Sequence, residues 1–186
     1  MRTRQVRSPT TGADAPAVRR AGDAALRITL GYGTGVASTV YGTVLVMATI
    51  TAAYANERDP AKLAEIVIAT ALVLWVAHLH AHSIAESIAL GRRVGRADIR
   101  RIAVREIGIV GAAALPCCAL ILGAVDVVPE STAVWGAFAI GLVTLGAEGI
   151  RYARMERLGA AAMAGAVALN LALGVGVVAL KVAIYH

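Results

Sequence analysis

Residues 28–55 read ITLGYGTGVASTVYGTVLVMATITAAYA, and no Asp, Glu, Lys, Arg or His interrupts them. At about 1.5 Å per residue a helix of this length is about 42 Å long, more than the ~30 Å of hydrocarbon in a bilayer. The alternating pattern of a membrane β-barrel strand is absent from the sequence, and backbone amides in lipid have no water to bond. The run therefore predicts a membrane-spanning helix.

The composition of the whole chain supports the same interpretation. Of its 186 residues, 58% are hydrophobic and only 16% are charged. Soluble domains carry about 25% charged residues. The composition thus excludes a soluble domain, a disordered chain, a coiled coil and a secreted disulfide scaffold, and the length is typical of one domain.

Four further apolar runs predict helices at 63–90, 107–125, 131–150 and 158–185. We therefore expect an all-α protein, a bundle of five transmembrane helices over 28–186, preceded by a disordered basic tail at 1–27. The motif Ala53-Tyr54-Ala55 resembles a signal-peptidase site, so cleavage there is the alternative to a retained first helix.

Two connections constrain how these helices meet. The link 126–130 is so short that the helices on either side of it must be antiparallel neighbours. The basic stretch 92–105 predicts a short helix at the membrane interface, with a small apolar face formed by Ile99 and Ile102.

The net charge is +6. All 18 basic residues except Lys181 lie outside the apolar runs, and when the helices alternate in direction they divide into 15 on one side of the membrane and 3 on the other. The positive-inside rule then predicts a cytoplasmic N-terminus and an external C-terminus. Arginine outnumbers lysine 16 to 2, as in GC-rich bacterial genes, so we expect a multi-pass protein of the bacterial cytoplasmic membrane. The basic charge serves insertion and contact with anionic headgroups rather than nucleic-acid binding.

The second predicted helix carries the most informative polar residues. His78, His82 and Glu86 are spaced four residues apart and so form one ridge, whereas His80 points roughly the opposite way. Ionisable groups at membrane depth normally face the bundle interior and often mark ion or proton paths. The ridge therefore predicts a divalent-cation site or a proton relay. The alternative is that His82 and Glu86 lie at the cytoplasmic headgroups and pair with arginines of the loop.

A second group of polar residues falls near the midpoints of the predicted spans. Tyr41, His78, Cys117, Cys118 and Asn170 could form one polar layer at the bilayer centre, the depth at which transporter sites are common. The cysteines would suit zinc, but buried cysteine more often acts as a small apolar residue, and asparagine as a bond between helices.

Four other residues need no functional interpretation or serve only local structure. Pro116 removes a backbone N–H within the third helix and should kink it. Glu148 and Arg151 are expected to form an ion pair at headgroup level. Lys181 can extend its stem to the outer headgroups.

Small residues recur at four-residue spacing, which permits close helix packing. Packing within the chain is the simpler interpretation, and a homodimer is the alternative. The pairs are Gly31 with Gly35, Ser38 with Gly42, Ala161 with Gly165, and Asn170 with Gly174.

The sequence lacks HExxH, GxSxG, P-loop and spaced CxxC motifs, so we expect no enzyme. It identifies no cofactor, and a divalent metal would enter only as the transported ion. Transport of a small divalent cation or of protons is the leading hypothesis. A non-transporting accessory or assembly protein is the alternative.

Over residues 30–185 the chain resembles the vacuolar iron transporter (VIT) family. The resemblance is carried by Val40-Tyr41-Gly42-Thr43, by Gly111-Ala112-Ala113-Ala114-Leu115-Pro116, by the glycine-rich fifth helix and by the number of spans. It implies five helices, a cytoplasmic N-terminus and a dimer that exports divalent metal from the cytosol. The chain departs from that family in two ways. It has no aspartate beside Gly42, and arginines replace the acidic metal-binding domain between the second and third helices, so no metal ligand can be carried over. It is also similar to small actinobacterial integral membrane proteins without an assigned role.

Overall fold

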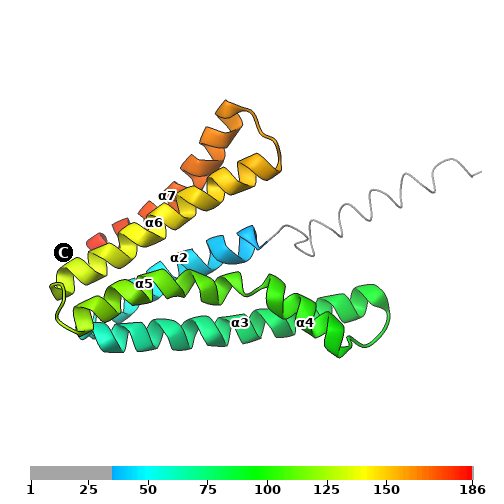
Figure 1. Ribbon diagram of the computed structural model, residues 1–186, viewed down its shortest axis with the longest axis horizontal. Coiled ribbons are helices and arrows are strands. Elements are labelled where there is room, and N and C mark those ends of the chain that lie inside the picture. Colours follow the sequence, from blue (N-terminus) through cyan, green and yellow to red (C-terminus); the bar gives the residue numbers. More distant parts are fainter. Residues whose placement is uncertain (1–34, 186) are drawn as a thin grey trace, which may run out of the picture. The chain divides into compact units, whose positions relative to one another are not determined.

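Helices account for every regular element in the part of the chain that the structure describes. The computed structural model describes residues 35–185, so the predicted tail at 1–27 and the start of the first predicted span lie outside the described residues. In chain order the helices are α2 (Val36–Ala53), α3 (Pro60–Leu90), α4 (Arg96–Arg105), α5 (Gly108–Ala124), α6 (Glu130–Met155) and α7 (Ala160–Tyr185) (Figure 1).

The described residues contain five helical segments that are long and apolar enough to cross a membrane. They are Val36–Ala53, Pro60–Leu90, Arg96–Ala124, Glu130–Met155 and Ala160–Ala183. The third segment joins α4 to α5. The prediction of an all-α chain with five helical segments of membrane-spanning length and apolarity is confirmed for the described residues.

The helix ends follow local chemistry that hydropathy alone does not resolve. The first residue of α3 is Pro60, three residues before the predicted start, because the Asp59 side chain accepts a hydrogen bond from Ala61 N at 2.9 Å. It ends at Gly91, whose φ of 60° is easily adopted by glycine. The apolar run of α6 stops near Ile150, yet the helix continues to Met155, since exposed arginines are good helix formers.

The bundle is built around α2, which packs against α3, α5, α6 and α7. Fully buried side chains fill the space between these helices, among them Met47, Ile50, Leu63, Leu120, Phe138 and Leu145. The short link after α5 does place α5 beside α6, as predicted.

Two glycines from the predicted small-residue pairs lie where helices touch. A Cβ on Gly42 would lie 2.8 Å from Ile109 Cα in α5, and one on Gly174 would lie 2.7 Å from side chains of α6. Both positions serve packing within the chain. Gly165, in contrast, has open space where a Cβ would be.

The basic stretch forms α4, the short helix predicted there, and α4 folds back beside the C-terminal part of α3 (Figure 1). Ile102 is fully buried, whereas Ile99 is 41% exposed, so only one of the two predicted apolar residues is covered. The Trp75 indole of α3 donates a hydrogen bond to Ala103 O at 3.2 Å and so ties the two helices together.

Candidate functional site

The predicted ridge of α3 exists as one face of that helix. The His78 and His82 rings are 6.2 Å apart, and both side chains are partly buried. Glu86 is 8% exposed. His80 is exposed, away from the ridge. Glu86 and His82 of the ridge contact α4 and the residue that follows it, whereas His78 contacts α2.

Glu86 forms an ion pair with Arg101 of α4. Arg101 also donates to Asp98 at 3.0 Å, and Arg92 donates to the other oxygen of Asp98 at 2.8 Å. The hydrogen bond to Asp98 raises the pKa of the Arg92 guanidinium. The carboxylate end of the ridge is therefore part of an arginine–carboxylate network that reaches the 91–95 turn.

His82 meets a carboxylate that the sequence patterns did not single out. Its Nε2 lies 3.5 Å from Glu106 Oε1, and the same oxygen accepts a hydrogen bond from Arg105 Nε at 3.0 Å. Glu106 is 7% exposed. It lies at the end of the basic stretch, where counting only lysine and arginine hides it. The one available signal was an acidic residue among six arginines next to an apolar run.

His78 bonds to its own helix and contacts α2. Its Nδ1 lies 3.1 Å from Leu74 O, and because a carbonyl oxygen only accepts, Nδ1 must carry the proton. The Tyr41 ring lies 4.8 Å from the His78 ring. Tyr41, His78, His82 and Glu106 therefore follow one another in space from α2 to the junction of α4 and α5.

The other members of the predicted central layer bond to helix backbones instead. Cys117 Sγ lies 3.9 Å from Ala64 O, and Asn170 Nδ2 donates to Leu145 O at 3.2 Å. Cys118 is exposed. Among the described residues, the one contact that joins members of this layer from different helices is the ring contact between Tyr41 and His78. The helix α5 continues through the buried Pro116, and the kink there stays a prediction.

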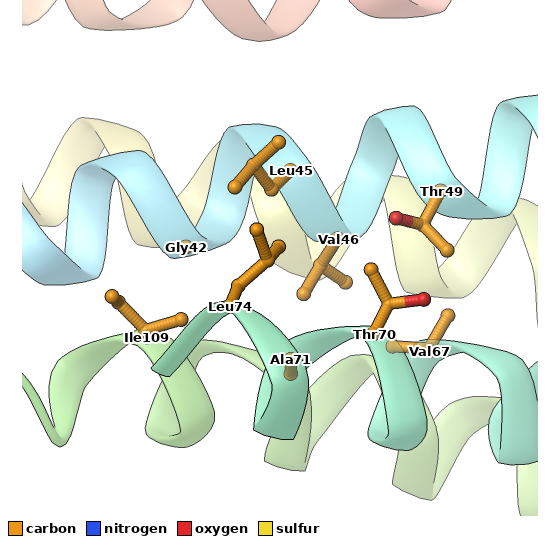
Figure 2. A pocket seen from close by; sticks show the side chains of 9 residues that line it. All are labelled: Gly42, Leu45, Val46, Thr49, Val67, Thr70, Ala71, Leu74 and Ile109. Atoms are coloured by element: carbon orange, nitrogen blue, oxygen red, sulfur yellow. The ribbon is translucent and has the colours of Figure 1, made fainter. Parts of the chain in front are cut away.

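The space between α2 and α3 next to the ridge is apolar and narrow. Figure 2 shows Val46 and Leu74 pointing into it, with Thr49 and Thr70 farther along. It leaves no room for a water molecule. Its walls are Gly42, Leu45, Val46, Thr49, Val67, Thr70, Ala71, Leu74 and Ile109. No titratable residue is among these walls, so the series of titratable side chains does not continue from His78 into this space.

Lys181 differs from its expected placement. Instead of extending outward it is 7% exposed, and its Nζ lies 4.6 Å from the Tyr54 ring centre, 4.5 Å from that of Trp135 and 4.6 Å from that of Phe138. These rings come from helices distant in sequence, which is why the sequence did not reveal the enclosure. The expected pair of Glu148 and Arg151 is present at 3.2 Å.

Within residues 35–185, no group of three or more His, Cys, Asp or Glu side chains is arranged to hold a metal ion. No protein-family model, curated protein or solved structure matches the chain. The five apolar helical segments are what indicates the class of the protein, a multi-pass helical membrane protein.

Proposed function

We propose that the chain is a non-transporting accessory or assembly protein, in which the α3 ridge anchors a basic helical hairpin at one membrane surface. The hairpin is the C-terminal part of α3, the 91–95 turn and α4. The observation that carries the proposal is the pairing of the ridge with α4 and its C-terminal flank, Glu86 with Arg101 and His82 with Glu106. As proposed, the protein is not an enzyme.

Helix lengths support an interfacial depth for the ridge. The 31 residues of α3 make it about 46 Å long, which exceeds the ~30 Å hydrocarbon, so one end of it must project. Because arginine is costly inside a bilayer, the four arginines of α4 favour the end that α4 covers. The Tyr41–His78 contact is also close to that end, since Tyr41 is only the sixth residue of α2, about 8 Å from its start.

The hairpin carries exposed arginines that suit an anionic surface. The Arg92 and Arg101 side chains are 55% and 53% exposed, and Arg93, Arg96 and Arg100 are exposed as well. Each basic residue near anionic headgroups contributes about 1 kcal/mol of attraction. By the positive-inside rule this end faces the cytoplasm of a bacterial cell, and the partner of the hairpin is the anionic inner leaflet.

Cysteine accessibility tests the depth. In a Cys117→Ala/Cys118→Ala background, Ile84→Cys introduces a thiol on the exposed face of α3, level with the ridge, and Val73→Cys is the matched control farther along the same face. A membrane-impermeant charged maleimide needs an aqueous thiolate. We expect modification of Ile84→Cys and none of Val73→Cys in liposomes. Protection of Ile84→Cys would overturn the interfacial placement.

The second candidate is transport of a divalent cation or of protons, including the dimeric metal export that kinship with the VIT family would imply. It is favoured by the continuous series Tyr41, His78, His82 and Glu106. Zinc, iron, manganese or cobalt would then raise the melting temperature of the purified protein, or protons would cross liposomes. His78→Ala and His82→Ala would abolish either effect, and that result would replace the accessory proposal.

A further inference from the structure

A cavity of about 320 Å³ opens at the arginine-rich end, between the start of α2, the junction of α4 and α5, and α6. Gly35 and Thr39 of α2, Arg105 and Gly108 of the junction, and Arg151 of α6 contribute to its walls. The residues that pair in the proposed anchoring, Glu86 with Arg101 and His82 with Glu106, are not part of its wall.

Arg105 is fixed in this wall on two sides. Its Nε donates to Glu106, and its backbone carbonyl lies 3.1 Å from Ser38 Oγ of α2. The Arg105 side chain is 17% exposed. A guanidinium has five N–H donors, and Glu106 takes one of them, so the remaining donors can serve a ligand in the cavity.

Arg151 of α6 contributes a second guanidinium to the wall. It pairs with Glu148 one turn earlier at 3.2 Å, and its side chain is 49% exposed. Neither Glu106 nor Glu148 is part of the cavity wall. Among the described residues of the wall, Arg105 and Arg151 are the two that carry a charge, and both are positive.

The start of α2 adds a partial positive charge. Its N-cap, Gly35, has no side chain to accept from the first N–H groups of the helix, which are left without intrahelical acceptors. The position of this helix end is fixed by a close approach, because a Cβ on Gly108 would lie 2.7 Å from Thr39 Oγ1. Gly35 itself has φ +73°, which favours glycine.

We propose that this cavity binds the phosphate group of an anionic ligand, and that in the membrane this ligand is an anionic phospholipid headgroup. Two arginine forks recognise phosphate oxygens through paired N–H donors, and basic pockets between membrane helices bind such headgroups. A soluble phosphate would satisfy the same chemistry. The inference requires a membrane protein, but not the interfacial depth of the ridge.

Thermal-shift titration of the full chain in detergent tests the site. The probes are dihexanoyl phosphatidylglycerol, dihexanoyl phosphatidylcholine and inorganic phosphate. A ligand that binds the folded state raises the melting temperature. We expect a larger shift with phosphatidylglycerol than with phosphatidylcholine. In Arg151→Gln and in Arg105→Gln the apparent affinity should fall roughly tenfold, since each loses a charged fork.

The control is Arg154→Gln, which removes an exposed arginine of α6 outside the cavity wall and should keep the affinity. Arg151→Lys keeps the charge but loses the fork, and should bind with intermediate affinity. If inorganic phosphate raises the melting temperature and Arg151→Gln abolishes this effect, the cavity is a phosphate site, but its ligand is soluble rather than a lipid. No shift with any probe, or equal losses in Arg151→Gln and Arg154→Gln, would overturn the proposal whatever the cysteine accessibility gives.

Discussion

The two ends of the described bundle hold buried charge in opposite ways. At the arginine-rich end, Glu86 and Glu106 are buried carboxylates, each paired with an arginine. At the other end, Lys181 is equally buried but lies against ring faces, and the described residues offer it no ion-pair partner. Ring faces carry partial negative charge, so they can stabilise an ammonium without a carboxylate. Buried charges in the described bundle are therefore stabilised in two ways, by ion pairs at one end and by aromatic rings at the other.

Each end also contains its own fluorescent reporter. The chain has two tryptophans, Trp75 beside α4 and Trp135 beside Lys181. The variant Trp135→Phe keeps Trp75 and reports the unfolding of the arginine-rich end. The variant Trp75→Phe keeps Trp135 and reports the unfolding of the end that holds Lys181. The contrast between the ends can thus be measured rather than inferred from a single melting temperature.

The largest effect is expected from Lys181→Glu. It places a buried anion against the negative faces of three rings and should lower the free energy of unfolding by about 3 kcal/mol or more. Lys181→Met keeps the volume without the charge and is the control, with a loss of about 1 kcal/mol from the cation–π contacts. Thermal unfolding followed by Trp135 fluorescence measures both. Equal stability of the two variants would show that the rings do not select for a cation.

At the arginine-rich end, Glu106→Gln should have the next largest effect. It leaves the largely buried Arg105 without its carboxylate and should cost about 2 kcal/mol, read from Trp75 fluorescence. Glu148→Gln is the control, because its partner Arg151 is half exposed and such pairs contribute about 0–1 kcal/mol. A Glu106→Gln variant no less stable than Glu148→Gln would contradict the importance of the buried pair.

The contrast between the ends also explains what the sequence could and could not predict. Helical spans follow from hydropathy along one segment, and so the described part of the five-span bundle was predictable. The extra turn of α6 beyond Ile150 was not, because a helix can continue into solvent after its apolar run ends.

The candidate site was predictable only where it depends on one helix. Four-residue spacing is enough to place His78, His82 and Glu86 on one face. Their partners Arg101 and Glu106 come from another element, and the order of contacts across α3 and α4 depends on how the hairpin packs. The rings around Lys181 come from the end of α2 and from α6, both far from Lys181 in the sequence, so no local sequence pattern could predict this contact.

A smaller effect is expected when the indole bond at the arginine-rich end is removed. Trp75→Phe loses the hydrogen bond to Ala103 O and should lower stability by about 1 kcal/mol. Trp135→Phe keeps an aromatic face toward Lys181 and should lower it by only about 0.5 kcal/mol. The melting temperatures of the two variants, measured by circular dichroism, give the comparison. A larger loss in Trp135→Phe would mean that the aromatic enclosure depends on the indole itself.

The smallest effect is that of salt, and it should separate the ends most cleanly. Mobile ions screen exposed charges, and at about 1 M sodium chloride the screening length is only ~3 Å. The Arg92 and Arg101 side chains are more than half exposed, whereas Lys181 is 7% exposed. Added salt should therefore lower the free energy of unfolding that Trp75 reports in Trp135→Phe, by less than about 1 kcal/mol. The free energy of unfolding that Trp135 reports in Trp75→Phe should stay unchanged. Equal shifts of both reporters would mean that the ends unfold as one unit, and the division into an ionic and an aromatic end would then describe contacts but not separate stabilities.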